Sequence, residues 1–301
     1  MSLTSVTKPD DGAEGAPTHP AAKREVLHVE GETSSMDAAD QLRLVVGRSE
    51  TPIQSGSAGV LSVIGLDERT RIMTTDLVPY VLICALEIES PWGMFVGTGW
   101  YIGRKTLITA GHCVYHRTQM GGWATRITVT PGASSGSQAP RGTTRATRFS
   151  TTDTWLADLN PDYDVAAIHL DDDLLPAGAA PFRVASLPDA ELTNMLINVS
   201  GYPADKGGKQ QWWARNRVRS LRPRRIFYDV DTMGGQSGAP AFILEKAGDT
   251  PLVVGVHAYG TGGTPSDLPL EVNSAPRITS DVLALFKQWV DQDTPGAAVR
   301  S

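Results

Sequence analysis

The 301-residue sequence predicts an all-β protein that ends in one helix. Two observations carry this prediction. From residue 63 onward, short apolar or alternating runs rich in β-branched residues recur between clusters of Gly, Pro, Asp and Asn. Near the end of the chain, residues 281–290 instead carry apolar side chains at helical spacing. Many short strands separated by turn signals are typical of a sandwich or a barrel.

Residues 1–61 differ from the rest of the chain, because they are rich in Pro, Gly, Ser, Thr, Asp and Glu and poor in aromatic residues. Such a segment buries too little apolar area to offset the entropy lost on ordering. We therefore expect a mostly disordered leader or propeptide. The start shows no basic stretch followed by an apolar core, so no ordinary signal peptide is recognised.

The strand predictions rest on run length and β-branched content. The predicted strands cover residues 80–88, 99–102, 107–110, 165–168, 196–199, 226–230 and 252–256. A helix is predicted over 280–291 with Ser280 as its N-cap, and residues 293–301 are expected to form a tail.

Composition excludes several classes of function. The net charge is −6, from 27 Lys and Arg against 33 Asp and Glu, which gives no reason to expect nucleic-acid binding. No apolar run approaches the ~20 residues that span a bilayer, so no membrane partner is expected. The sequence has no zinc-like cysteine spacing and no clustered carboxylate loop, so we expect no metal and no cofactor.

The two cysteines, Cys84 and Cys113, leave two alternatives open. They form one disulfide, or they are two free buried thiols, because cysteine is among the most buried residue types. The sequence does not give the Cα separation on which a bridge depends. A disulfide would favour export from the cell.

Three short stretches hold candidate catalytic residues. Ser237 lies among three glycines in residues 234–240, and glycine allows the tight turn and close substrate approach that a nucleophile needs. His112 follows an apolar strand and can act as a general base. Asp164 directly precedes another apolar strand, where a carboxylate can be held rigidly to orient an imidazole; Asp162 competes for this role.

The order of the three residues along the chain strengthens the prediction that they act together. His112, Asp164 and Ser237 follow one another at separations of 52 and 73 residues, from 112 to 164 and from 164 to 237. This order is that of the chymotrypsin fold, whereas subtilisins and α/β-hydrolases have other orders. Ala239 also stands where the nucleophile elbow of the α/β-hydrolases needs glycine.

The sequence motifs around these residues resemble those of chymotrypsin-fold serine peptidases and, more narrowly, those of the bacterial glutamyl endopeptidases. The resemblance covers roughly residues 62–290. Four further stretches support it, namely residues 63–71, 201–206, 231–235 and 255–257. It implies an extracellular serine endopeptidase with protein or peptide substrates. An inactive binding protein of the same fold and an intracellular protease remain the alternatives.

The resemblance also implies a domain organisation. Residues 1–61 would be the leader or propeptide, and residues 62–292 the peptidase domain, which is expected to be monomeric. This domain would contain two six-stranded antiparallel β-barrels, at roughly 62–180 and 181–279, and the C-terminal helix. The mature chain would begin at Ser62 or Val63.

The resemblance assigns a role to each motif residue. Ser237 would be the nucleophile, His112 the general base and then the general acid, and Asp164 the residue that orients His112. The backbone N–H groups of Gly235 and Ser237 would form the oxyanion hole, and no metal takes part. Because Gln236 replaces the aspartate that precedes the nucleophile in trypsin-like enzymes, their activation switch is absent.

Two further positions point to the substrate preference. The resemblance implies that Thr232 and His257 hold a substrate glutamate, since a hydroxyl and an imidazole can bind a carboxylate without a fixed cation. Asp231 lies six residues before Ser237, where trypsin-like enzymes bind Lys or Arg, and a carboxylate there would attract cations. The sequence therefore favours cleavage after Glu or Asp, with cleavage after Arg or Lys as the alternative.

Overall fold

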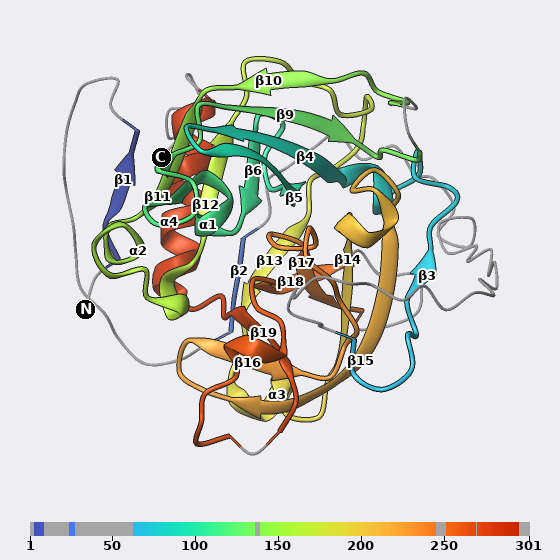
Figure 1. Cartoon of the computed structure of the whole chain (residues 1–301), viewed down its shortest axis with the longest axis vertical. Helices are drawn as coiled ribbons and strands as arrows, with labels where there is room; N and C mark the ends of the chain where they lie inside the picture. The colour runs from blue at the N-terminus through green and yellow to red at the C-terminus, as the bar shows by residue number, and fades with distance from the viewer. Residues whose placement is uncertain are drawn as a thin grey trace.

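The computed structural model describes residues 3–8, 24–27, 63–135, 139–244, 251–268 and 270–294. Two curled β-sheets make up most of this part of the chain, with the first above the second in Figure 1. The prediction of an all-β, chymotrypsin-like fold with a C-terminal helix is confirmed. The first sheet has eight strands and the second nine, so each is larger than the six expected. One strand at residues 5–7 and one at residues 25–27 account for part of the difference.

The first sheet comes mainly from residues 83–169. Its strands, in spatial order, are β1 (Ser5–Thr7), β11 (Arg148–Thr152), β12 (Ala166–His169), β6 (Thr106–Thr109), β5 (Gly93–Tyr101), β4 (Ile83–Ser90), β9 (Arg126–Pro131) and β10 (Thr144–Ala146). A small separate sheet pairs β7 (Tyr115–His116) with β8 (Gly122–Trp123). All pairings in the first sheet are antiparallel.

The second sheet follows in the chain and differs in one pairing. Its strands, in spatial order, are β19 (Asn273–Pro276), β16 (Arg225–Tyr228), β15 (Trp212–Leu221), β14 (Leu196–Gly201), β17 (Pro240–Ile243), β18 (Leu252–Val256), β13 (Arg183–Ser186) and β2 (Glu25–Leu27), with β3 (Thr70–Arg71) paired to β15. The pairing of β13 with β18 is parallel, whereas the other pairings are antiparallel.

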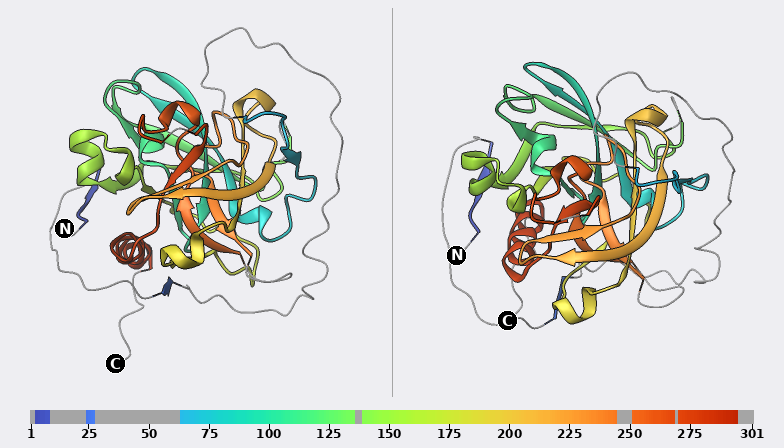
Figure 2. Two further views of the ribbon diagram at one scale, coloured as in Figure 1. Left: turned by 90° about the horizontal axis from the view of Figure 1, so that it is seen from below. Right: turned by 60° about the horizontal axis from the view of Figure 1, so that its bottom comes forward.

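Two segments of the predicted leader form strands, which differs from the disorder expected for them. β1 pairs with β11 of the first sheet, and β2 pairs with β13 of the second, so each covers an edge that would otherwise be open (Figure 2). Side chains add to the pairing, because Trp289 donates a hydrogen bond of 2.8 Å to Ser5. These edges supply the backbone partners that the leader sequence cannot supply by itself.

The helices are few and short except for the last. They are α1 (Gly111–Val114), α2 (Asp153–Asp158), α3 (Asp189–Leu192) and α4 (Ser280–Asp293), with 3₁₀ turns η1 (Tyr80–Leu82), η2 (Pro161–Tyr163), η3 (Ala204–Lys206) and η4 (Thr261–Gly263). Helix α4 contacts strands of both sheets and confirms the predicted C-terminal helix. Its N-cap is Thr279, and Ser280 is already the first helical residue, so the capping prediction was wrong by one position.

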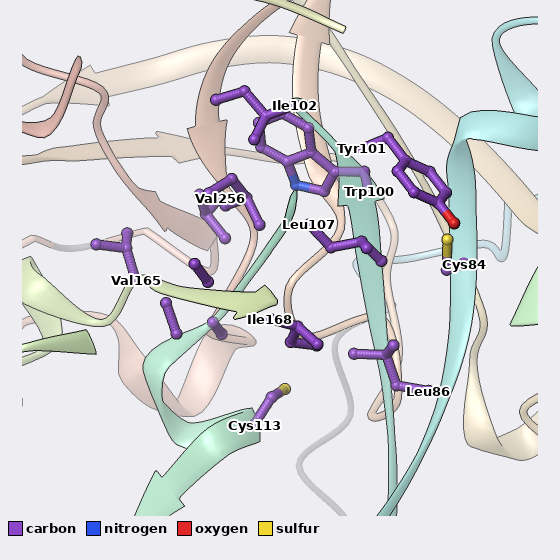
Figure 3. Close-up of a cluster of buried hydrophobic side chains, with 14 of the residues drawn as sticks. Cys84, Leu86, Trp100, Tyr101, Ile102, Leu107, Cys113, Val165, Ile168 and Val256 are labelled. Atoms are coloured by element: carbon purple, nitrogen blue, oxygen red, sulfur yellow. The ribbon is translucent and has the colours of Figure 1, made fainter. Parts of the chain in front are cut away.

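The disulfide alternative for Cys84 and Cys113 is wrong, because both are free buried thiols. Cys84 lies on β4, whereas Cys113 lies on α1 with its sulfur 3.7 Å from the carbonyl oxygen of Ser237. Figure 3 shows the two thiols in separate parts of one apolar cluster, with Leu86 between them in the view. The two cysteines therefore pack against different parts of the fold.

Candidate active site

The site begins with an imidazole and a carboxylate that are brought together across the first sheet. His112 lies on α1, directly after β6, and Asp164 lies just before β12. The Nδ1 atom of His112 is 2.7 Å from one oxygen of Asp164, and its backbone N–H donates to the other at 2.8 Å. A Cβ at Gly111 would lie 2.9 Å from the carboxylate, so glycine leaves room for this approach.

The charge of Asp164 governs the protonation of His112. Burial lowers the pKa of His112, but the Asp164 charge and hydrogen bond, together with Cys113, raise that pKa well above its ordinary value. The carboxylate is fully buried, whereas the His112 side chain keeps 22% exposure. The imidazole can therefore accept a proton from the cleft while its other nitrogen stays fixed.

Ser237 lies close to this pair in a loop of the second sheet. Its carbonyl oxygen accepts a 2.8 Å hydrogen bond from the N–H of Thr98 and contacts Cys113, the neighbour of His112. Gly238 makes the turn, with φ +88° and a position where a Cβ would lie 2.1 Å from the Thr98 oxygen. In the described part of the chain, the Ser237 hydroxyl makes no hydrogen bond to His112; such bonds are commonly long before substrate binds.

Two backbone N–H groups at this turn point to oxyanion binding. Gly235 has φ +95°, and a Cβ there would lie 2.6 Å from the Tyr202 oxygen. Among the described residues, no group accepts a hydrogen bond from the N–H of Gly235 or of Ser237. Two unpaired donors beside a serine hydroxyl could bind a developing oxyanion.

Thr232 and His257 are both buried beside this turn. Within the described residues, the Thr232 hydroxyl has no hydrogen-bond partner, although buried hydroxyls normally have one. His257 is fixed by Tyr228, whose hydroxyl lies 2.8 Å from Nδ1. Burial and the nearby charge of His112 lower the pKa of His257 to about 3, so this imidazole is neutral.

Asp231 has a structural use that the sequence did not predict. Its two carboxylate oxygens accept hydrogen bonds of 2.8 Å from the backbone N–H groups of Ile64 and Glu68. Burial raises the pKa of Asp231, and these two N–H groups oppose that rise. Asp231 thus holds the segment from Ile64 to Glu68 through both of its carboxylate oxygens.

A neighbouring ion pair links the same segment to the turn at residues 234–238. Arg69 is 7% exposed and pairs with both oxygens of Asp205, at 3.0 and 2.8 Å. Asp205 follows Ala204, whose N–H donates a 2.7 Å hydrogen bond to the carbonyl of Gly234. The sequence pattern did not identify this connection, because no motif links Arg69 with Asp205.

A cavity of about 300 Å³ opens beside His112. It is lined by His112, His116, Gln119, Trp155, Leu159, Pro161, Ala258 and Tyr259. No role in the site was expected from the sequence for Tyr259 or for the buried Arg225, whose guanidinium lies 4.9 Å from the centre of the Tyr259 ring. In the part of the chain that the structure describes, no group of three or more His, Cys, Asp or Glu side chains could hold a metal ion.

Comparison with known proteins agrees with this fold and site. A family model described as a trypsin-like peptidase domain matches residues 97–256. A glutamyl endopeptidase of Bacillus licheniformis is 34% identical over 76% of this chain and 69% of its own length. A Bacillus subtilis protein named extracellular metalloprotease is 32% identical over 77% of this chain and 70% of its own length.

Solved structures extend the comparison. A Glu endopeptidase crystallised with MPD superposes with a TM-score of 0.65 at 26% identity, covering 76% of this chain and all of that one. The protease Anisep from Arthrobacter nicotinovorans shares the fold, with a TM-score of 0.58 at 19% identity over 74% of this chain and 99% of its own. The chain therefore belongs to the trypsin-like peptidase family and is a serine endopeptidase of the chymotrypsin fold.

Proposed function

We propose that this serine endopeptidase cleaves peptide bonds after Glu, and less readily after Asp. The observation that carries the proposal is the buried hydroxyl of Thr232, which has no hydrogen-bond partner among the described residues. His257 is buried and neutral, and its carbonyl oxygen accepts a 2.7 Å hydrogen bond from the N–H of Gly238 in the same turn. Because the Tyr228 hydroxyl can donate to Nδ1, the ring proton of His257 would sit on Nε2. A hydroxyl and an imidazole N–H would then receive the substrate carboxylate.

The proposed chemistry uses His112, Asp164 and Ser237. The Ser237 oxygen attacks the scissile carbonyl carbon while His112 takes the hydroxyl proton, and the N–H groups of Gly235 and Ser237 bind the oxyanion. His112 then gives the proton to the leaving amine as the C–N bond breaks. Water, deprotonated by His112, hydrolyses the acyl-enzyme and frees Ser237.

The alternative preference for Arg or Lys has less support. It requires the Asp231 carboxylate to face a substrate cation, but both of its oxygens already accept backbone hydrogen bonds. Asp231 is also only 3% exposed, so little of its carboxylate is open to a substrate cation. Glutamyl specificity is therefore the better-supported proposal.

Maturation forms part of the proposal. Residues 1–61 would be a propeptide, residues 62–292 the peptidase domain with barrels at 62–180 and 181–279, and 293–301 a tail. Ser62 lies outside the described residues. Asp231 anchors Ile64 and directly precedes Thr232, so a new amine at Val63 would lie close to the pocket and add a positive charge.

We further propose that the enzyme is exported and works as a monomer. One of the relatives carries the word extracellular in its name. None of the described helices has the length and apolar character needed to cross a membrane.

Matched peptides that differ only in the residue before the scissile bond test the preference. We expect the order Glu, Asp, then Phe, Lys and Arg. Thr232→Val keeps the shape of the side chain but removes its hydroxyl, and should lower kcat/KM for Glu peptides about 10- to 100-fold, with little change for Phe peptides. Faster cleavage after Arg or Lys than after Glu would refute the proposal.

The role of the N-terminus needs a separate measurement. A recognition site for a specific protease, inserted before Val63 in the full chain, allows the same sample to be assayed before and after cleavage. We expect glutamyl activity to rise on cleavage, and Ser237→Ala to remain inactive in both states. Full activity of the uncut chain would contradict the propeptide role but leave the specificity proposal intact.

A further inference from the structure

The backbone at Asp164 forms a tight turn. Asp164 has φ −76° and ψ 66°, and the N–H of Val165 donates a 2.9 Å hydrogen bond to the carbonyl of Tyr163. This is the geometry of an inverse γ-turn, with the aspartate at its centre. The carboxylate lies 2.7 Å from Nδ1 of His112 and accepts its backbone N–H at 2.8 Å. A displacement of the turn would therefore disturb both contacts with His112.

Strand pairing does not reach this turn. The antiparallel pairing of β11 with β12 ends where Thr151 lies opposite Ala166, two residues after Asp164. The carbonyl groups on either side of Asp164 therefore need other partners, because a buried carbonyl without a hydrogen bond is costly.

Two successive threonines at the end of β11 supply these partners. The hydroxyl of Thr152 donates to the carbonyl of Tyr163 at 2.9 Å, and that of Thr151 donates to the carbonyl of Val165 at 2.8 Å. Both threonines have an exposed fraction of 0%. The turn that carries Asp164 is thus held at both ends by neighbouring side chains of one strand.

Thr152 has a second contact that settles the direction of its hydrogen bond. Its oxygen accepts the backbone N–H of Trp155 at 3.1 Å and so caps helix α2, which leaves its single proton for the carbonyl of Tyr163. The ring of Trp155 lies against His112, with centroids 6.4 Å apart. Thr151 has no helix-capping contact within the described chain, so it is the cleaner position to test.

We propose that Thr151 and Thr152 are positioning residues for peptide-bond hydrolysis: their hydroxyls fix the turn that holds the Asp164 carboxylate against Nδ1 of His112. This inference rests on the proposed catalytic roles of His112, Asp164 and Ser237. The competing role is purely structural, in which the hydroxyls satisfy two buried carbonyls and nothing more.

The pH dependence of catalysis separates the two roles. Burial lowers the pKa of His112, but Asp164 and Cys113 raise that pKa well above its ordinary value. A less firmly held Asp164 should lower the pKa of His112 and move the acid limb of kcat/KM to lower pH. The other titratable and charged groups around the His112–Asp164 pair stay in place; they are Cys113, His116, His257, Tyr259 and Arg225.

Thr151→Val tests the hydroxyl, because valine keeps the shape and the β-branching of the side chain. We expect kcat for a Glu peptide to fall about three- to tenfold, the effect of one hydrogen bond, with KM within about twofold. The acid limb should fall by about 0.3 pH unit. Thr151→Ser keeps the hydroxyl and should restore most of kcat.

Thr75→Val is the matched control. The Thr75 hydroxyl is buried and donates a 2.6 Å hydrogen bond to the carbonyl of Gly132, so the substitution removes the same kind of contact elsewhere. We expect kcat of Thr75→Val within about twofold of the parent and an unmoved acid limb. A loss of kcat equal to that of Thr151→Val would overturn the positioning role.

A double-mutant cycle with Asp164→Asn gives the sharpest test. If Thr151 acts through the Asp164 carboxylate, Thr151→Val should change the residual kcat of Asp164→Asn less than about twofold. The same fold loss in both backgrounds would overturn the proposal. Thermal unfolding checks that each variant is folded, and Thr152→Val enters the same cycle if Thr151→Val does not fold.

Labelling with a sulfonyl fluoride separates this inference from the proposed catalytic residues. Failure of the wild-type protein to label at Ser237 would overturn the catalytic assignment itself. Labelling at Ser237, together with a Thr151→Val variant that has wild-type kcat and an unmoved acid limb, would overturn only the positioning role.

Discussion

The described part of the chain contains two Ser–His–Asp clusters, and the more complete of them by side-chain geometry is not the one at the cleft. On the first sheet, the Ser150 hydroxyl lies 2.8 Å from Nε2 of His169, and Nδ1 of His169 lies 2.7 Å from Asp293. At the cleft, His112 has the same 2.7 Å contact to Asp164 but no hydrogen bond to the Ser237 hydroxyl.

The surroundings of the two serines explain the difference. Ser150 is fully buried on β11, between β12 and the leader strand β1, and its hydroxyl also contacts Thr7 at 3.0 Å. Ser237 is partly exposed on a glycine turn whose N–H groups are unpaired within the described chain. Access and unpaired backbone donors therefore distinguish the proposed catalytic site from a structural network made of the same side chains.

Replacing each serine by alanine gives the largest expected contrast. Ser237→Ala should lower kcat by about 10⁵- to 10⁶-fold, because it removes the nucleophile. Ser150→Ala should leave kcat within about threefold, because Ser150 is fully buried and cannot meet a substrate. Steady-state hydrolysis of a Glu peptide measures both, and a comparable loss in Ser150→Ala would remove the distinction.

The two carboxylates offer a second contrast. Asp164→Asn should lower kcat about 10³- to 10⁴-fold, because an amide there favours the wrong tautomer of His112. Asp293→Asn should retain activity, because its contacts are with His169, Thr106 and Arg148. The same peptide assay decides, and near-normal activity of Asp164→Asn would count against the assigned role of Asp164.

For the free energy of unfolding, we expect the opposite order: substitution in the His169 cluster should cost more than substitution in the His112 cluster. His169→Leu leaves the hydroxyl of Ser150 and the buried carboxylate of Asp293 without their shared partner, and should lower the free energy of unfolding by ~3 kcal/mol. Asp164→Asn should change it by less than about 1 kcal/mol, because the isosteric amide keeps one acceptor. Urea unfolding in the Ser237→Ala background avoids autolysis, and equal losses would contradict the contrast.

Two histidines at the cleft, His257 and His112, should make the free energy of unfolding depend on pH, and this effect is smaller than those above. The pKa of His257 is lowered to about 3, so between its ordinary value of 6.5 and 3 only the unfolded chain binds this proton, and stability falls as pH falls. His257→Gln should flatten the slope of unfolding free energy there by up to about 1.4 kcal/mol per pH unit.

His112 should behave in the opposite way. Its folded pKa is raised, so it contributes stability below its ordinary value of 6.5 that is lost as pH rises through the folded pKa. His112→Gln should therefore be less stable than the parent at acidic pH and should converge with it at alkaline pH. Urea midpoints measured across pH test both histidines, and parallel curves for variant and parent would contradict the assignment.

The sequence predicted those structural features that short local motifs specify. The strands, the C-terminal helix and the stretches around His112, Asp164 and Ser237 each depend on neighbouring residues, and the order of the three residues indicated the fold. The role of Asp231 depends on a contact across 167 residues, which no local pattern specifies. The state of Cys84 and Cys113 likewise depends on how the sheets pack.

The leader strands β1 and β2 each close a terminal edge of a different sheet. Cleavage before Val63 would leave them attached only by hydrogen bonds and side-chain contacts, and their departure would expose the edges of β11 and β13. Open edges pair readily with other chains. The mature enzyme would then be more prone to self-association than its precursor, so retention of the cleaved leader would protect it in solution.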